Sequence, residues 1–147
     1  MTDFSALPTL EAAHIEAAHT ESEHASTVLA LTQQLLSILQ EQHGYDISQI
    51  KTDAVSLEHW GKDWTKHFAP APSAIVFPKS TEQVQALVKL ANEHNIVITP
   101  SGGRTGLSAG AVASNGEIVV SLDKMNKIGQ FYPADRLVEV EAGVITE

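Results

Sequence analysis

Residues 100–111, which read PSGGRTGLSAGA, combine residue types suited to binding an anion. Glycine permits backbone turns closed to other residues and lets a ligand approach successive N–H groups within hydrogen-bond distance. Thr105 and Ser108 add hydroxyl donors, and Arg104 adds a cation capable of charge-assisted hydrogen bonds. The pattern favours a phosphate-binding loop. A glycine-rich surface connection that binds nothing is the alternative.

Spacing separates this loop from two common phosphate-binding motifs. The dinucleotide fingerprint needs two glycines that are two positions apart, and no two of the loop glycines at 102, 103, 106 and 110 have that spacing. The Walker motif ends in Gly-Lys-Ser/Thr, but the Gly61–Lys62 pair is followed by Asp63. Both motifs are excluded, and the spacing alone does not identify the anion that the loop would bind.

The other candidate ligands are histidines. His14, His19 and His24 stand five residues apart, and five residues of helix turn about 140° beyond one full turn, so the three share no face. We therefore expect no metal site there and interpret residues 1–22 as a polar, partly disordered arm. His59 and His67 are interpreted as surface or connector residues and not as acid–base groups.

A broad apolar stripe predicts a helix over residues 24–42. Its members are Val28, Leu31, Leu35 and Ile38 at spacings of three and four, widened by Leu29, Leu36 and Leu39. Gly44 suits the left-handed position after a helix end. Residues 52–72 then read as a connector that carries Trp60 and Trp64, either as a wall of a ligand site or as an irregular aromatic cover over a core.

The segment 73–101 reads as strand, helix and strand. SAIVFP and IVITP are apolar runs typical of buried strands. The helix between them starts with a Ser80–Gln83 capping box and stops near Asn95. Its predicted inner face consists of Val84, Leu87, Val88 and Ala91. Such a βαβ unit has parallel strands, and ligands of α/β sheets bind beyond the carboxyl ends of the strands, where the glycine loop begins.

Consecutive strands are predicted after the loop. EIVVSL is a third strand, and IGQFYPADRLVEVEAG predicts two strands around a turn at 133–135. The fold class is therefore predicted as α+β. The chain stops at AGVITE, which resembles the start of another element, so we expect a fragment.

Composition limits the possible partners. The chain has 147 residues, no cysteine and a formal net charge of −9, which argues against nucleic acid as the main partner because phosphate backbones need a basic face. Disulfides and thiolate chemistry are excluded within the chain. No secretory signal and no apolar run long enough for a transmembrane segment are visible. We expect a soluble, cytoplasmic protein.

The loop and its flanks resemble the FAD-linked oxidases with the vanillyl-alcohol-oxidase (PCMH-type) flavin fold. The similarity is to the branch of D-lactate dehydrogenase, D-2-hydroxyglutarate dehydrogenase and glycolate oxidase. That branch shows Pro, two small residues, a polar residue, Thr-Gly-Leu and a pair of small residues; here three small residues separate Pro100 from Arg104, which is followed by Thr-Gly-Leu. SAIVFPKSTEQVQALVKLANEHNIVITP, EIVVSLDKMNKI and LVEVEAGV resemble the family's flanking segments in the same order, so the match runs from about residue 60 to 147. Ala109 departs from the family, which commonly has glycine there.

Composition and periodicity predict an arm (1–22) and a helix with connector (23–72), and the resemblance implies the first part of an FAD-binding PCMH-type domain (73–147). The residues it implies for FAD are Ser101, Gly102, Gly103, Arg104, Thr105, Gly106, Leu107, Ser108, Gly110 and Ala111, with Gly143 and Val144 where the chain returns to the flavin. Asp123 and Asn126 resemble a recurrent stretch that we interpret as a structural turn more than as an FAD contact. Berberine-bridge relatives carry a flavin-linking histidine at the position of Arg104, so the FAD is predicted to be non-covalent.

The implied function is that of a flavin-dependent oxidoreductase of a 2-hydroxy acid such as D-lactate, D-2-hydroxyglutarate or glycolate. In the family a hydride passes to flavin N5, and the catalytic base, metal-binding histidines and substrate arginines would follow residue 147. We therefore assign no catalytic residue and no metal ligand here, expect the chain alone to be inactive, and keep a homodimer as a hypothesis. The alternatives are a non-catalytic FAD- or nucleotide-binding half-domain that needs a partner chain, and a fragment that folds without binding. A reductase of cell-wall precursor synthesis shares the flavin fold, but the Thr-Gly-Leu loop favours the hydroxy-acid branch.

Overall fold

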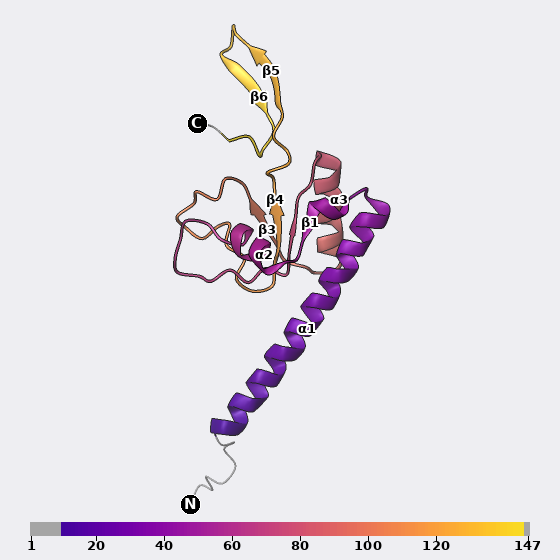
Figure 1. Ribbon diagram of the computed structural model, residues 1–147, viewed down its shortest axis with the longest axis vertical. Helices are drawn as coiled ribbons and strands as arrows, with labels where there is room; N and C mark the ends of the chain where they lie inside the picture. The colour runs from indigo at the N-terminus through magenta and orange to yellow at the C-terminus, as the bar shows by residue number, and fades with distance from the viewer. Residues whose placement is uncertain (1–9, 146–147) are drawn as a thin grey trace, which may run out of the picture.

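The computed structural model describes residues 10–145, with side chains described from residue 26 onward. The side chains of His14, His19 and His24 therefore lie outside the described part. Figure 1 shows a long helix and a hairpin that extend from opposite ends of a central sheet. The elements in chain order are α1 (Leu10–Gln42), η1 (Ile47–Gln49), β1 (Ile50–Lys51), α2 (Ala54–Trp60), β2 (Ala74–Val76), α3 (Thr81–Glu93), β3 (Ile98–Ser101), β4 (Ile118–Ser121), β5 (Ile128–Tyr132) and β6 (Leu137–Val140).

The central sheet has the strand order β1-β2-β4-β3. Strands β2, β4 and β3 run parallel, and β1 is antiparallel to β2. Helix α3 connects β2 to β3, so the predicted βαβ unit and the α+β class are confirmed. Strand β4 lies between β2 and β3. Its residues Ile118, Val119 and Val120 are apolar and buried on both faces, as a central parallel strand requires.

Strand β3 lies at the edge of the sheet, and the prediction that it is buried is wrong for most of its length. Ile98 and Thr99 are half-buried and Pro100 is exposed, whereas Ser101 at the strand end is buried. Proline has no N–H to donate to a second neighbouring strand, which suits it to an edge position.

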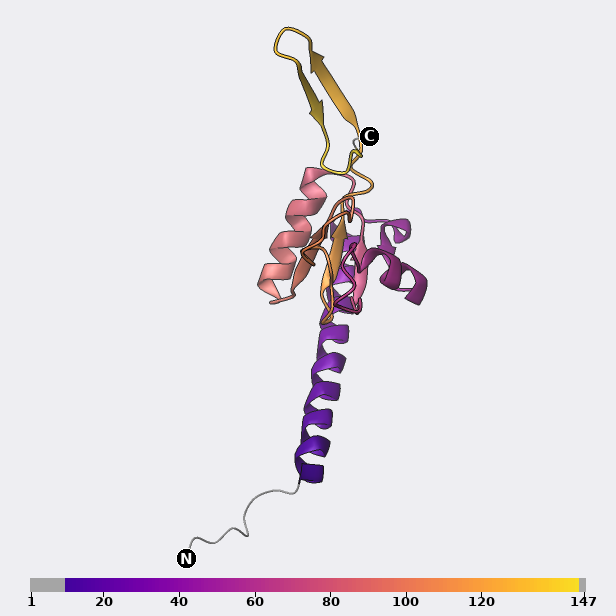
Figure 2. The same ribbon diagram turned by 90° about the vertical axis from the view of Figure 1, so that its left-hand side faces the viewer.

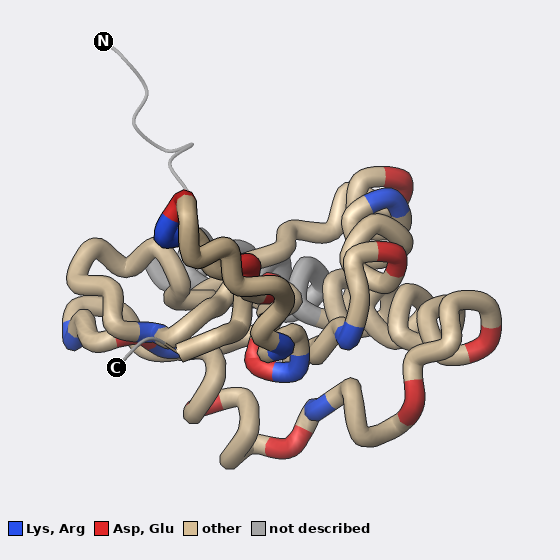
Figure 3. Tube along the Cα trace, turned by 90° about the horizontal axis from the view of Figure 1, so that it is seen from above, with Lys and Arg blue, Asp and Glu red and all other residues tan. Residues whose placement is uncertain are grey.

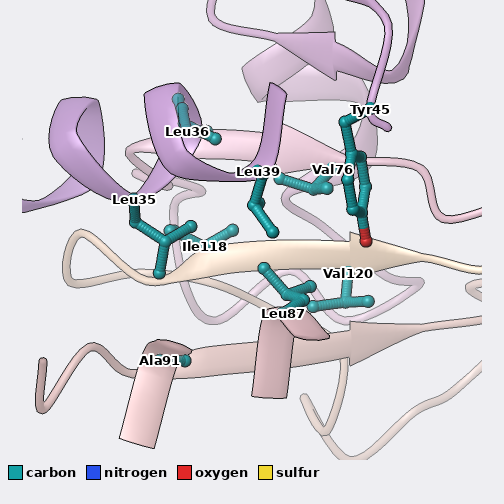
Figure 4. Close-up of a cluster of buried hydrophobic side chains, with 10 residues drawn as sticks. Leu35, Leu36, Leu39, Tyr45, Val76, Leu87, Ala91, Ile118 and Val120 are labelled. Atoms are coloured by element: carbon teal, nitrogen blue, oxygen red, sulfur yellow. The ribbon is translucent and has the colours of Figure 1, made fainter. Parts of the chain in front are cut away.

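Helices cover both faces of the sheet. Figure 2 shows α3 and α2 on opposite sides of it. The larger buried cluster, drawn in Figure 4, joins Leu35, Leu36 and Leu39 of α1 and Leu87 and Ala91 of α3 to Val76, Ile118 and Val120 of the strands. On the opposite face, Ile75, Phe77 and Val119 pack with Leu57 and Trp60 of α2. Because neighbouring residues of a strand point to opposite faces, Val119 and Val120 belong to different clusters.

The predicted amphipathic helix is confirmed, and its stripe is centred on Thr32, Leu35, Leu36 and Leu39. Leu29, predicted to widen the stripe, is 51% exposed. Helix α1 begins at Leu10 and not near residue 24, so the segment predicted as a polar arm is helical from residue 10 onward. Residues 1–9 lie outside the described part.

The predicted start and stop of α3 are confirmed, but only half of the predicted capping box is formed. The Ser80 hydroxyl accepts a hydrogen bond from the Gln83 N–H at 3.3 Å, while Gln83 Oε1 accepts from the Lys79 N–H at 2.8 Å and not from Ser80. Asn95 follows the helix with a φ of 53°, and Gly44 follows α1 with a φ of 66°. Both residues occupy the left-handed conformation typical of this position. The prediction that Val88 faces inward is wrong, because it is 45% exposed.

The connector contains a helix that the sequence pattern missed. Asp53 caps α2 by accepting a hydrogen bond from the Ser56 N–H at 3.0 Å. With 7 residues, α2 is too short to display an apolar period. Trp60 packs edge-on against Phe77 with ring centroids 5.2 Å apart, whereas Trp64 is 72% exposed. The aromatic cover is therefore formed by Trp60.

The predicted pair of consecutive strands forms the antiparallel hairpin β5–β6. Figure 1 shows it standing away from the central sheet, and every residue of both strands is exposed. Within the described residues, no helix is both long and apolar enough to span a bilayer.

The packing of α3 can be tested with two neighbouring residues. Leu87→Ala is expected to lower the free energy of unfolding by about 2–5 kcal/mol, because it removes a buried side chain and leaves a cavity. Val88→Ala, on the exposed side of the same helix, is the control and should change it by less than about 0.5 kcal/mol. Chemical denaturation followed by circular dichroism measures both. Equal losses would contradict the face that we assign to α3.

Candidate functional site

The glycine loop and a second turn leave the sheet side by side. Ser101 and Ser121 are register partners at the carboxyl ends of β3 and β4. Just beyond them, the Leu122 N–H donates to the Ser101 carbonyl at 3.0 Å. The chain returns to this turn after the hairpin, where the Gly143 N–H donates to the Met125 carbonyl at 2.8 Å. The glycine loop, the turn after β4 and the chain that returns from the hairpin thus meet beyond the carboxyl ends of β3 and β4.

A pocket of about 720 Å³ opens between these segments. Gly103, Arg104 and Thr105 line it from the loop, Asp123 and Asn126 from the turn after β4, and residues 142–145 from the returning chain, with Ile128 at the start of the hairpin. The two stretches assigned from the sequence, the loop and the return at Gly143 and Val144, therefore lie at the same pocket.

The remaining residues predicted for the site do not line this pocket. They are Ser101, Gly102, Gly106, Leu107, Ser108, Gly110 and Ala111. Ser101 is buried in the sheet, and the loop from Gly106 onward runs along the connector, where the Trp64 N–H donates to the Gly106 carbonyl at 3.2 Å. Ile128, Ala142 and Ile145 line the pocket without having been predicted. Their residue types carry no chemical signal that could have identified them.

The glycines of the site differ in what surrounds them. At Gly143, an added Cβ would lie 1.8 Å from the Leu122 carbonyl oxygen, so packing of the return against the turn demands glycine. At Gly102, Gly103 and Gly110, an added Cβ would have no atom within 4 Å, and none of the three has a positive φ. Nothing within the described part of the chain requires glycine at these positions.

Arg104 occupies the middle of the loop in an unusual conformation and is held by several hydrogen bonds. Its φ is 57°, a left-handed value that is uncommon for a residue other than glycine. Nη1 donates to Asp123 Oδ1 at 3.1 Å, and Nη2 donates to Asp123 Oδ2 at 3.2 Å. Nη1 also donates to the Gly102 carbonyl at 3.0 Å. The cation that was predicted to assist anion binding is therefore paired with a carboxylate.

Asp123 accepts a further hydrogen bond, from Trp60 Nε1 to Oδ2 at 2.9 Å. Burial of the carboxyl acts to raise the pKa of Asp123. The hydrogen bonds from Arg104 and Trp60, together with the charge of Arg104, outweigh burial and hold this pKa below its ordinary value. Asp123 is therefore a charged partner at neutral pH. It lies in the predicted turn, and it also lines the pocket.

Charge and metal-ligand chemistry are otherwise sparse around the pocket. Figure 3 shows Lys and Arg positions scattered among Asp and Glu along the described trace. Among the side chains from residue 26 to 145, no three His, Asp or Glu residues gather in a way that could hold a metal ion.

The chain is similar to proteins of a known family. The sequence model of the family described as FAD binding domain matches residues 72–147. A D-2-hydroxyglutarate dehydrogenase of Stutzerimonas stutzeri (strain A1501) is 64% identical over 98 residues, covering 67% of this chain and 21% of that protein. Another from Xanthomonas citri pv. viticola is 48% identical over 110 residues, covering 75% of this chain and 23% of that protein. The chain spans between a fifth and a quarter of the length of these two relatives.

A solved structure is also similar. The structure of p-cresol methylhydroxylase with substrate bound shares 30% sequence identity and a TM-score of 0.60, and the match covers 85% of this chain and 23% of that one. The family match over residues 72–147 contains all of the pocket-lining residues, from Gly103 to Ile145.

Ala109, the departure from the family's loop pattern, has a φ of 60°. Ala109→Gly is expected to raise the free energy of unfolding by about 0.5–1 kcal/mol, because relief of left-handed strain exceeds the added entropy of the unfolded chain. The control is Ala111→Gly, in the same loop at a residue without a positive φ. This substitution should lower the free energy of unfolding by about 0.4–1 kcal/mol. Thermal and chemical denaturation measure both. A loss of stability in Ala109→Gly would show that alanine is unstrained there.

Proposed function

Because this chain belongs to the FAD binding domain family, we propose that its pocket holds the diphosphate of a non-covalently bound FAD. The cofactor would serve a dehydrogenase that oxidises a 2-hydroxy acid. The observation that carries this proposal is the open space around Gly102 and Gly103 in a loop that borders a pocket of about 720 Å³.

The residues present fit a diphosphate. A ligand that approaches the backbone closely requires glycine, because a Cβ would stand between its oxygens and the N–H donors. This accounts for glycine at positions 102 and 103, where internal packing does not demand it. The backbone of the loop, and not the Ser101 hydroxyl that is buried in the sheet, is the proposed binding group.

The proposed role is cofactor binding more than proton transfer. FAD, when bound, supplies the acceptor of the hydride. The ionisable side chains along the described pocket lining are Arg104 and Asp123, which are paired with each other, so no free acid–base group faces the pocket. We propose that the catalytic groups lie elsewhere in the enzyme. A chain that holds FAD for a partner chain is the alternative, and the same pairing is compatible with it.

Non-covalent binding is supported by the residue types at the pocket. Its described lining contains no histidine, cysteine or tyrosine that could bond to the flavin. Arg104 stands where some relatives have the linking histidine, and a guanidinium remains protonated and non-nucleophilic at physiological pH. Hydrogen bonds and shape would then hold the cofactor.

D-2-hydroxyglutarate is the substrate that we favour over D-lactate and glycolate. The support is the identity of 64% and 48% to two proteins named D-2-hydroxyglutarate dehydrogenase. A cytoplasmic location and a homodimer stay predictions.

Titration of this chain with FAD tests whether the glycine loop binds the diphosphate. The wild-type chain is expected to change flavin fluorescence in a saturable way. Gly103→Val should weaken FAD binding by at least about tenfold, or about 1.4 kcal/mol, because its side chain fills the space left for the diphosphate. Gly103→Ala should change the free energy of unfolding of the ligand-free chain by less than about 1 kcal/mol.

The control for this titration is Ala30→Val, which also introduces a valine, on the exposed side of α1. It should bind FAD as the wild type does. Absence of a saturable signal from the wild-type chain would contradict FAD binding by the chain itself. Equal affinity of Gly103→Val and wild type would contradict the placement of the diphosphate at this loop.

A segment exchange tests the enzyme class and the substrate. In the Stutzerimonas stutzeri dehydrogenase, the segment aligned over 98 residues is replaced by the corresponding residues of this chain. The hybrid is expected to retain FAD and to oxidise D-2-hydroxyglutarate with kcat/KM within about tenfold of the parent, a difference of about 1.4 kcal/mol in transition-state stabilisation. D-lactate and glycolate are assayed beside it.

The outcomes of the exchange are separable. A folded hybrid without flavin would contradict the proposed cofactor site. A flavin-loaded hybrid that prefers D-lactate or glycolate would contradict the favoured substrate. The hybrid that also carries Gly103→Val should lose flavin in parallel with the effect of this substitution in the isolated chain.

A further inference from the structure

We propose that the ion pair of Arg104 and Asp123, anchored by Trp60, is a clamp that positions the glycine loop and does not itself bind the diphosphate. The inference rests on the proposed FAD site, because the affinity for FAD is the property that the clamp would set. It assigns positioning roles to three residues that lie in α2, in the loop and in the turn after β4.

The geometry of Arg104 leaves little of its charge for a ligand. Both terminal nitrogens donate to the carboxylate of Asp123, at 3.1 and 3.2 Å. This is the two-point contact that makes arginine–carboxylate pairs both strong and directional. The side chains of the pair are 21% and 35% exposed. Their formal charges cancel, so a diphosphate in the pocket would be met mainly by backbone N–H dipoles.

The ion pair holds the backbone of Arg104 in a left-handed conformation. A left-handed φ in a residue other than glycine is disfavoured and persists where the surrounding structure enforces it. For Arg104, the two bonds to Asp123 and the bond to the Gly102 carbonyl are the enforcing contacts. Gly103 and Thr105, its neighbours in the chain, line the pocket. The backbone angles at Arg104 therefore set how the loop faces the pocket.

Asp123 connects the loop to the opposite wall of the pocket. Its turn receives the returning chain so closely that a Cβ on Gly143 would lie 1.8 Å from the Leu122 carbonyl oxygen. The turn therefore cannot shift without moving the return. Trp60 holds the same carboxylate from the side, and its ring packs against Phe77, which is 4% exposed. The clamp thus ties both walls of the pocket to the core.

A direct ligand role for Arg104 predicts an effect of the opposite sign. If the guanidinium bound phosphate, removal of Asp123 would release it and would tighten FAD binding or leave it unchanged. If the pair is a clamp, removal of Asp123 frees the loop to leave its left-handed conformation, and FAD binding weakens. The sign of the change in FAD affinity for Asp123→Ala therefore separates the two roles.

The test measures FAD dissociation constants for the wild-type chain, Asp123→Ala, Arg104→Ala and the double variant, at a temperature where circular dichroism shows all of them folded. Each single variant is expected to bind about tenfold more weakly. The double variant should bind FAD no more weakly than the weaker-binding single variant, because each substitution already breaks the same ion pair. Unchanged or tighter binding by Asp123→Ala would overturn the clamp.

A glycine substitution provides the rescue. In the background of Asp123→Ala, Arg104→Gly should bind FAD within about threefold of the wild type, because glycine adopts a positive φ without support. Arg104→Ala in the same background should remain weak. A purely electrostatic role of Arg104 would make glycine and alanine equivalent, and that result overturns the proposal. Asp135→Ala, at an exposed aspartate in the hairpin turn, is the control and should leave FAD affinity unchanged.

Amide hydrogen exchange of the ligand-free chain separates failure of the clamp from failure of FAD binding. In Asp123→Ala, the amides of residues 103–106 should exchange at least about tenfold faster than in the wild type, while those of β4 stay protected. Equal exchange of these loop amides in both proteins overturns the clamp even if the wild type binds FAD. A wild-type chain that fails to bind FAD contradicts the proposed function, and this exchange result still decides the clamp.

Discussion

The parallel register of β3 and β4 is the constraint on which the site depends. It pairs Ser101 with Ser121, so that both strands end at the same level of the sheet, and the glycine loop and the turn with Asp123 leave from neighbouring points. A slip of β4 by one residue would exchange the faces of Val119 and Val120 and would move Asp123 by about 3.3 Å along the strand. The two clusters that bury these valines on opposite faces hold the register. Packing far from the pocket thereby brings its walls together.

Some glycines near the pocket lie in tightly packed surroundings, and others face open space. Gly143 is needed because the returning chain packs directly on the turn after β4, and Gly61 is needed because an added Cβ would lie 2.6 Å from the Leu57 carbonyl oxygen. Gly102 and Gly103 face open space. Packing therefore requires glycine at the first two positions, whereas the other two leave the open space in which we propose that a diphosphate binds.

An acidic chain can hold an acidic ligand when backbone groups supply the donors. The chain carries a formal net charge of −9, and the arginine in the loop is neutralised by Asp123. Oriented N–H groups act as fixed partial charges at short range, so an anion site needs no basic surface around it. The exclusion of nucleic acid drawn from composition and the proposal of a diphosphate site are therefore compatible.

Local patterns in the sequence determined most of the elements: the apolar runs of β2 and β4, the Ser80 cap, the left-handed stops at Gly44 and Asn95, and the position of the glycine loop after a strand. Each depends on neighbours in the chain. The seven residues of α2 gave too short a pattern to predict, and the exposure of Val88 depends on which side of α3 meets the sheet. The meeting of Arg104 with Asp123, 19 positions away, and of Asp123 with Trp60, 63 positions away, was decided by the tertiary structure alone. Strand order and register determine which distant side chains come within hydrogen-bond distance, and no local pattern encodes that choice.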